Sequence, residues 1–192
     1  MDRRELLQLL ALSPLPALGI SPAAVERAAR HAREAAGLGT PYAPAFFTAA
    51  EWRTVGVLAD LIVPRDERSG SATDAGVPEF IDFVMTEYPD HQVPVRGGLA
   101  WLGRECRERY GREFGDCTAA EQTALLDQIA WPARAAAEMS QGVAFFNRFR
   151  DLVLSGFWSS KVGVEDLGYL GNRVVTEWTG CPVSARGAER EE

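Results

Sequence analysis

The stretch that most constrains the fold is an amphipathic segment in the last third of the chain, residues 141–157. Its apolar residues recur at helical spacing, which predicts a helix with one buried face and other helices packed around it. The pair Ser155-Gly156 and later glycines predict that this helix stops and continues as an irregular loop rich in glycine and aromatic residues. Aromatic side chains on such a loop suit either docking to a partner protein or packing in the core of the same chain, and the pattern leaves both open. The apolar positions of the helix are Phe146, Phe149, Val153 and Phe157, and the loop aromatics are Phe157, Trp158 and Tyr169.

Helix start and stop signals divide the upstream chain into further helical segments. Two identical Thr-Ala-Ala-Glu capping boxes, at 48–51 and 118–121, each predict the start of a helix. Ser21 as N-cap with Pro22 at the first helical position predicts an earlier helix, and Gly111 is a left-handed cap that ends another. No stretch shows sustained apolar and polar alternation with β-branched residues. The sequence therefore predicts an all-α fold.

The expected organisation is a single compact helical domain over residues 46–183 with short segments on either side. A signal-like segment covers residues 1–20, and an alanine-rich helix with an extended linker covers 21–45. Because alanine side chains bury little surface, this helix is placed outside the compact domain. A polar tail, 184–192, ends the chain.

Charge and cysteine content exclude several classes of protein. The formal net charge is −7, the sequence pI is about 5.0 and Lys161 is the only lysine, whereas a nucleic-acid surface needs clustered cations. Three cysteines, Cys106, Cys117 and Cys181, are too few and too irregularly spaced for a disulfide framework or a zinc module. An odd count in an exported chain would leave one thiol for a bond to another subunit, and the alternative is three reduced, mostly buried thiols.

The N-terminus has the layout of an export signal. Arg3 and Arg4 are followed at once by an apolar run to about Ile20, which resembles a twin-arginine signal with three departures from the usual pattern. The run is too short to span a bilayer and contains two prolines, so no transmembrane span is expected. The departures from the twin-arginine pattern are Asp2, Leu6 and Gln8 in place of Ser or Thr, Phe and Lys. In the alternative, residues 3–12 are the first amphipathic helix of a cytoplasmic protein.

The sequence contains no recognisable combination of residues for catalysis. There is no nucleophile elbow, H-E-x-x-H, dinucleotide-binding G-x-G-x-x-G or Walker loop, and neither His31 nor His91 has a neighbouring Ser or Cys. The carboxylates of the polar loop 64–78 lack the spacing of an EF-hand, and nothing near Cys181 in sequence lowers the pKa of its thiol. We therefore expect no catalytic residue, no metal site and no cofactor in this chain.

Several short segments carry a family resemblance. They are Arg3-Arg4, Ala-Asp-Leu-Ile-Val-Pro at 59–64, Asp-Ala-Gly-Val-Pro-Glu-Phe-Ile-Asp at 74–82, the link at 114–121, Ser-Gly-Phe-Trp-Ser-Ser-Lys-Val-Gly at 155–163 and Leu-Gly-Tyr-Leu-Gly-Asn at 167–172. In this order and combination, the chain resembles the small subunit of membrane-associated sugar dehydrogenases, the gluconate 2-dehydrogenase subunit 3 family.

The resemblance implies an α-helical, non-catalytic subunit that binds a large FAD-containing oxidoreductase of the glucose-methanol-choline type. It implies that the twin-arginine signal carries the folded complex to the periplasm, that FAD belongs to the partner, and that a cytochrome c subunit is a further candidate partner. The Gly-Tyr-Leu-Gly-Asn ending resembles the branch associated with glycoside 3-dehydrogenases. The alternatives are a self-contained small enzyme and a helical adaptor unrelated to redox chemistry. The candidate partner-binding residues are Phe157, Trp158, Tyr169, Asn172 and Cys181, and the candidate export residues are Arg3 and Arg4.

Overall fold

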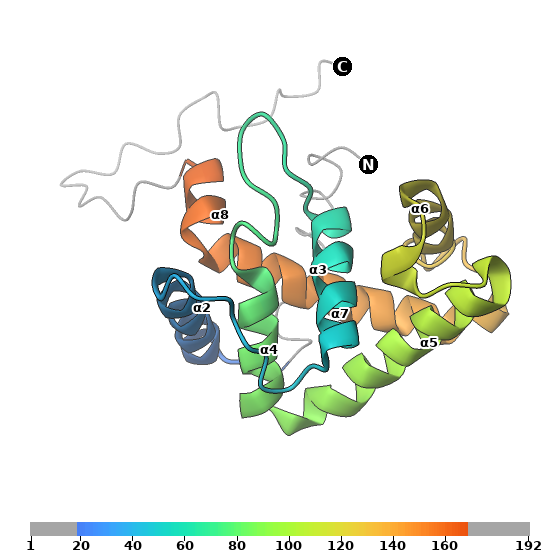
Figure 1. The fold of residues 1–192 in the computed structure, drawn as a ribbon, viewed down its shortest axis with the longest axis horizontal. Helices are drawn as coiled ribbons and strands as arrows, with labels where there is room; N and C mark the ends of the chain where they lie inside the picture. Colours follow the sequence, from blue (N-terminus) through green and yellow to red (C-terminus); the bar gives the residue numbers. More distant parts are fainter. Residues whose placement is uncertain (1–18, 169–192) are drawn as a thin grey trace, which may run out of the picture.

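The computed structural model describes residues 19–168, and every regular element in that range is helical (Figure 1). The prediction of a compact all-α fold is confirmed. In chain order the helices are α2 (Pro22–Gly37), α3 (Ala49–Ile62), α4 (Val77–Glu87), α5 (Gln92–Tyr110), α6 (Ala119–Asp127), α7 (Ser140–Ser159) and α8 (Lys161–Asp166), with the 3-10 turns η2 (Pro89–His91), η3 (Phe114–Asp116) and η4 (Ala137–Met139) between them.

Helix α7 is the element around which the others pack, and α2, α3, α4, α5 and α8 all contact it (Figure 1). Phe149, Leu152 and Val153 of α7 are fully buried and belong to one continuous hydrophobic core. Burial of a side chain of this size contributes roughly 1.5–3 kcal/mol. The buried face predicted for this helix from its apolar spacing is therefore confirmed.

The helix ends form where the local sequence signals place them. Thr48 and Thr118 each cap a helix with both hydrogen bonds of a capping box, to Glu51 and Glu121 respectively. The Ser21 hydroxyl accepts from the third residue of α2, and Gly111 has a left-handed φ of 70° at the end of α5. Each of these caps satisfies backbone groups that a helix end leaves without an internal partner.

The predicted break at Ser155-Gly156 is wrong, because α7 continues through both residues. Gly156 instead lets helix α4 approach closely. A Cβ at Gly156 would lie only 2.9 Å from Cδ1 of Phe80. The helix is followed by Ser160, whose side chain caps α8, so Phe157 lies on a helix and not on a loop.

Helix α2 belongs to the core, although the sequence pattern placed it outside. It packs against α4 and α7, and its small side chains allow the helix backbones to approach closely. The compact part of the chain therefore begins upstream of the expected boundary at residue 46. The buried alanines of α2 are Ala24, Ala28, Ala29 and Ala32.

Within residues 19–168, no helix combines the length and the apolar character that a bilayer span requires. The longest, α7, has 20 residues and carries Arg148, Arg150 and Asp151 near its middle.

Helices α5 and α7 interlock through two glycines. Gly98 of α5 lies against the ring of Phe145 from α7, and Gly142 of α7 lies against the ring of Trp101 from α5. A Cβ at either glycine would overlap the opposing ring. Each helix thus supplies one ring and one glycine to the contact.

We expect Gly98→Ala to destabilise the fold, because the added methyl group would overlap Phe145. Overpacking of this kind costs about 1–3 kcal/mol, which corresponds to a fall in Tm of roughly 2–10 °C. Gly97→Ala is the matched control, since no described atom lies within 4 Å of a Cβ there, and removing an exposed helical glycine stabilises by roughly 0.5–1 kcal/mol. Thermal unfolding followed by circular dichroism measures both variants. An unchanged Tm for Gly98→Ala would contradict the interlocked contact.

Candidate functional site

The carboxylate of Asp82, on α4, holds the segment between α2 and α3 in place. Its side chain is 0% exposed, yet both oxygens are fully used as acceptors. A carboxylate can be buried only when donors replace its water, and these charge-assisted hydrogen bonds do so. The segment 42–47, of which residues 42–45 were expected to be part of an extended linker, is therefore fixed against α4. The donors are Tyr42 Oη–H (2.9 Å) and Ala45 N–H (2.8 Å) to Oδ2, and Phe46 N–H (3.0 Å) and Phe47 N–H (3.2 Å) to Oδ1.

Tyr42 and His31 extend this hydrogen-bonded group toward α2. His31 Nε2 lies 3.3 Å from the Tyr42 hydroxyl. Burial, together with the hydrogen bond to the Asp82 carboxylate, raises the pKa of Tyr42 well above its ordinary value. The hydroxyl therefore stays protonated at neutral pH and acts as a donor to the Asp82 carboxylate.

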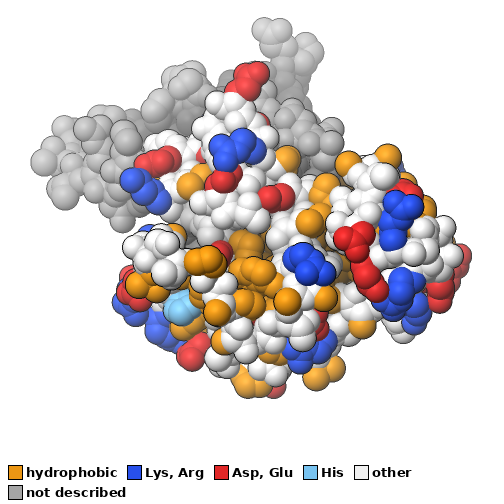
Figure 2. Space-filling view, viewed as in Figure 1, with side chains coloured by type: hydrophobic (Ala, Val, Ile, Leu, Met, Phe, Trp, Pro, Cys, Tyr) orange, Lys and Arg blue, Asp and Glu red, His pale blue; other side chains and the backbone are white. Residues whose placement is uncertain are grey.

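Around this anchor, aromatic side chains from three helices and the α2–α3 segment form one cluster, which we call the aromatic surface. The Tyr42 and Trp52 rings lie 5.4 Å apart between centroids, and the His31 and Phe83 rings lie 4.8 Å apart. Each of its five members is half-buried, with part of its surface open to solvent. Figure 2 shows hydrophobic side chains gathered over the α2–α3 connection and α4, beside a histidine. The members are His31, Tyr42, Phe46, Trp52 and Phe83.

Arg96 of α5 closes one edge of the aromatic surface. Its guanidinium lies 4.1 Å from the centroid of the Phe46 ring, donates to the Phe46 carbonyl at 2.9 Å and donates to Glu51 at 2.9 Å. Burial of Glu51 opposes its charged form, but the hydrogen bonds from Thr48 N–H and Arg96 prevail and lower the pKa of this carboxyl. The ion pair fixes the orientation of the guanidinium over the ring.

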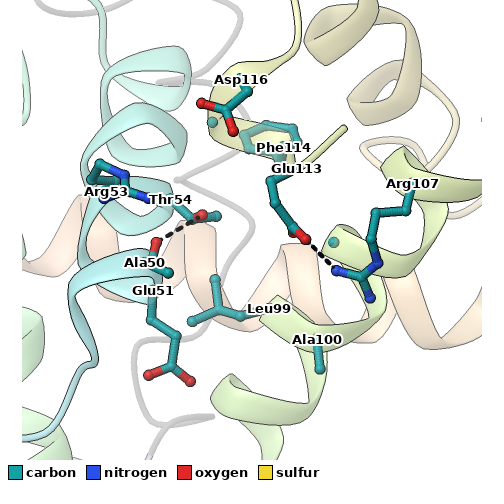
Figure 3. A pocket seen from close by; sticks show the side chains of 12 residues that line it. Ala50, Glu51, Arg53, Thr54, Leu99, Ala100, Arg107, Glu113, Phe114 and Asp116 are labelled. Atoms are coloured by element: carbon teal, nitrogen blue, oxygen red, sulfur yellow. Dashed lines mark hydrogen bonds and ion pairs between the residues drawn. The ribbon is translucent and has the colours of Figure 1, made fainter. Parts of the chain in front are cut away.

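A small cleft continues from Glu51 between α3, α5 and η3 (Figure 3). Its volume is about 190 Å³, below the roughly 300–1,000 Å³ of most small-molecule pockets. Leu99 and Phe114 provide an apolar lining, and Arg107 donates to Glu113 at 2.6 Å along the opposite wall. Such a cleft can accept one side chain of another protein. Arg53 and Asp116 add opposite charges to its lining (Figure 3).

The carboxylates of the polar loop 64–76 support the loop itself. Asp66 accepts from the N–H groups of Arg68 and Ser69, both at 2.9 Å, and Asp74 accepts from Ser71 N–H at 2.7 Å. Among residues 19–168, no group of three or more His, Cys, Asp or Glu side chains is arranged to hold a metal ion.

Two of the residues predicted to bind a partner lie in the described range. Phe157 is 0% exposed, so its prediction as a partner contact is wrong: the helix that carries it turns the ring into the core. Trp158 is half-buried against Phe157, with ring centroids 5.0 Å apart, and its indole Nε1 is buried without a hydrogen-bond acceptor among the described residues. Tyr169, Asn172, Cys181, Arg3 and Arg4 lie outside the described residues.

Sequence reasoning missed the aromatic surface. Its one local signal was the density of aromatic residues between Tyr42 and Trp52. The proline-rich context assigned Tyr42 to a linker, whereas Phe46 and Trp52 were assigned to the compact domain. The decisive residue, Asp82, lies on α4 and ends the segment 74–82 that carries part of the family resemblance, but nothing in its sequence neighbours marks it as a buried acceptor.

We expect Tyr42→Phe to lower stability at neutral pH by about 1–3 kcal/mol, because the Asp82 carboxylate loses one donor. The variant should also weaken the alkaline dependence of Tm. Because the folded-state pKa of Tyr42 is raised, its contribution is present below its unfolded pKa of about 10 and is lost as pH rises beyond that value. Thermal melts between neutral pH and about pH 11 test this, with Tyr110→Phe as control. Parallel alkaline losses in wild type and Tyr42→Phe would refute the role of this hydroxyl.

Residues 49–177, more than half of the chain, match the family described as Gluconate 2-dehydrogenase subunit 3. Comparisons with curated proteins and with solved structures gave no match. The matched region begins at the first residue of α3 and contains Asp82, Trp52, Phe83 and Arg96, while Tyr42 and His31 precede it. The chain therefore belongs to the gluconate 2-dehydrogenase subunit 3 family, whose members are accessory subunits of dehydrogenase complexes.

Proposed function

We propose that this chain is the non-catalytic small subunit of a sugar or glycoside dehydrogenase and that it binds and stabilises a large FAD-dependent subunit of the glucose-methanol-choline type. In this proposal FAD and the catalytic residues belong to the large subunit, and this chain holds no cofactor. The family assignment supports the role of a subunit. The observation that carries the docking role is the aromatic surface held by Asp82.

The aromatic surface has the composition of a protein-binding site. Tyr, Trp, Phe and Arg are enriched at the energetically important centres of interfaces, and here Tyr42, Trp52 and Phe46 lie beside Arg96. The anchoring hydrogen bonds fix the segment 42–47 before any partner arrives. Binding therefore loses little conformational entropy, which is a major cost of association.

The cleft beside Glu51 extends the proposed interface toward η3. We assign it to a single side chain of the large subunit, because its apolar lining and charged wall suit a long side chain with a polar end. Trp158, Tyr169 and Asn172 are proposed as further contacts, and Cys181 as the residue that bonds covalently to the partner in an oxidising compartment.

Ala43 offers a direct test of the aromatic surface. It is exposed and follows Tyr42, so Ala43→Arg should place a long charged side chain on this surface without disturbing the core. We expect at least a tenfold rise in Kd for the large subunit with little change in Tm, since a misplaced charge at the centre of an interface is costly to desolvate. Co-expression, affinity capture and titration of the purified subunits provide the measurements.

Ala124→Arg is the matched control, because Ala124 is also exposed but lies on α6, at the opposite edge of the molecule from α2 (Figure 1). It should leave binding unchanged. Equal affinities for both variants would assign the interface to another surface. Flavin absorbance and sugar oxidation by the small subunit alone would favour a self-contained enzyme, and failure to capture a flavoprotein from co-expressing cells would favour an adaptor unrelated to redox chemistry.

We propose that the complex acts in the periplasm after export by the twin-arginine route and associates with the membrane through its partners, among which a cytochrome c subunit is a candidate. Export signals of this class are recognised as an address and not as charge. Arg3→Lys combined with Arg4→Lys should therefore retain both subunits in the cytoplasm. Cell fractionation with dehydrogenase assays measures the distribution, and Arg27→Lys combined with Arg30→Lys in α2 is the control. Normal periplasmic activity in the Arg3 and Arg4 double variant would support the cytoplasmic alternative or another route.

A further inference from the structure

A second cleft lies between α2, the start of α4 and the junction of α7 with α8, at the edge of the molecule that α2 and α8 share (Figure 1). We call it the α2–α8 cleft. Its volume is about 130 Å³, which is below the range of small-molecule pockets. The cleft has room for a side chain of another protein and not for a substrate.

Two of the sequence segments that carry the family resemblance meet at this cleft. The segment 74–82 contributes Gly76 and Phe80 to its lining, and the segment 155–163 contributes Gly156 and Lys161. Gly156 permits the close contact between the two segments, because a Cβ there would lie only 2.9 Å from Cδ1 of Phe80. Neither the aromatic surface nor the cleft of Figure 3 includes these four residues.

The floor of the α2–α8 cleft is apolar. Ala29 and Ala32 of α2 are each 5% exposed, and Phe80 of α4 is 1% exposed. The Ser160 hydroxyl also lines the cleft, but it donates to a backbone carbonyl of α7 at 2.7 Å and accepts from a backbone N–H of α8 at 3.0 Å. The floor therefore suits an apolar side chain.

The rim of the cleft carries an excess of positive charge. Arg33 is exposed and has no hydrogen-bond or ion-pair partner among residues 19–168. The Lys161 side chain is 81% exposed and lies 3.8 Å from Glu165, an exposed pair that contributes little. Asp74 is the acidic residue of the lining, and Arg65 compensates its charge at 2.6 Å. This positive rim belongs to a chain whose formal net charge is −7.

We propose that the α2–α8 cleft is a second docking point for the large subunit and accepts an aliphatic side chain from an acidic segment of that protein. The aliphatic group lies on the floor formed by Ala32 and Phe80, and carboxylates beside it pair with Arg33 and Lys161. An apolar centre with a polar rim is the usual build of a protein interface. This inference rests on the proposed function, because it takes the large subunit as the partner.

The rim charges disfavour other occupants. A basic segment would meet like charges at Arg33 and Lys161, and an uncharged segment would cover these cations without pairing them, which costs free energy. Exposed charges of this kind also attract an acidic segment over a distance that depends on ionic strength. Binding through the cleft should therefore weaken as salt is added.

Charge reversal at the rim tests the proposal on the intact subunits. For Arg33→Glu combined with Lys161→Glu, we expect the Kd for the large subunit to rise at least tenfold in about 50 mM salt and by less in about 0.5 M salt, where exposed charges are screened. Arg33→Lys combined with Lys161→Arg keeps both charges and should bind as the wild type does. Both side chains are exposed, so the Tm of each variant should stay near that of the wild type. Titration of the purified subunits at the two salt concentrations gives the Kd values.

A substitution at Ala36 tests the apolar floor. Ala36 is exposed on the last turn of α2 and lines the cleft. In Ala36→Trp the indole should occupy the space that the partner's side chain needs and raise the Kd at least tenfold, to the same extent at both salt concentrations. Ala124→Trp is the matched control, because Ala124 is an exposed alanine of α6, at the opposite edge of the molecule from α2 (Figure 1).

The outcomes separate this inference from the proposed function. Wild-type affinity in either the charge-reversed chain or Ala36→Trp would overturn the assignment of the α2–α8 cleft. Tighter binding by the charge-reversed chain would reveal a basic partner segment and overturn it as well. If Ala43→Arg weakens binding in the same titrations, the proposed function stands without this second docking point. If the wild-type chain binds no flavoprotein, both the proposed function and this inference are rejected.

Discussion

A buried negative charge on α4 is the constraint on which the N-terminal half of this fold depends. Asp82 is fully excluded from solvent, and its cost of burial is offset by four donors that all come from residues 42–47. The α2–α3 connection and α4 can therefore reach their final positions only together. The same hydrogen bonds position Tyr42 and Phe46 next to Trp52, so a requirement of stability produces the aromatic surface.

This arrangement suits a subunit whose role is to hold another protein. The core around α7 supplies a scaffold, and the exposed features lie on its periphery: the aromatic surface on one side and the cleft between α3, α5 and η3 beside it. Arg96 and Glu51 connect the two, since Glu51 pairs with Arg96 and also lines the cleft. The aromatic surface and the cleft are therefore adjacent, and one partner could contact both.

Local sequence signals predicted the helices and their ends well, because a cap depends on residues within one turn of it. Thr48 and Thr118 cap helices through hydrogen bonds to residues three positions later, and Gly111 ends α5 through its own left-handed backbone. The failures involve contacts between distant residues. Gly156 was expected to break a helix and instead admits Phe80 from α4, and the alanines of α2 were expected to bury too little surface, although their small size is what allows close packing. Asp82 could not be distinguished from a surface carboxylate until the residues that donate to it were placed beside it.

The paired glycines of α5 and α7 limit how the molecule can move. Phe145 fills the space at Gly98, and Trp101 fills the space at Gly142, so sliding either helix along the other would drive both rings into Cβ atoms or backbone. Shear between these helices is therefore blocked, and the pair behaves as one rigid body. Any adjustment that accompanies partner binding must be taken up by elements outside that pair, such as the polar loop 64–76. The boundary runs along the edge of the aromatic surface, since Arg96, whose guanidinium lies over the Phe46 ring, belongs to the rigid pair and the five members of the surface do not.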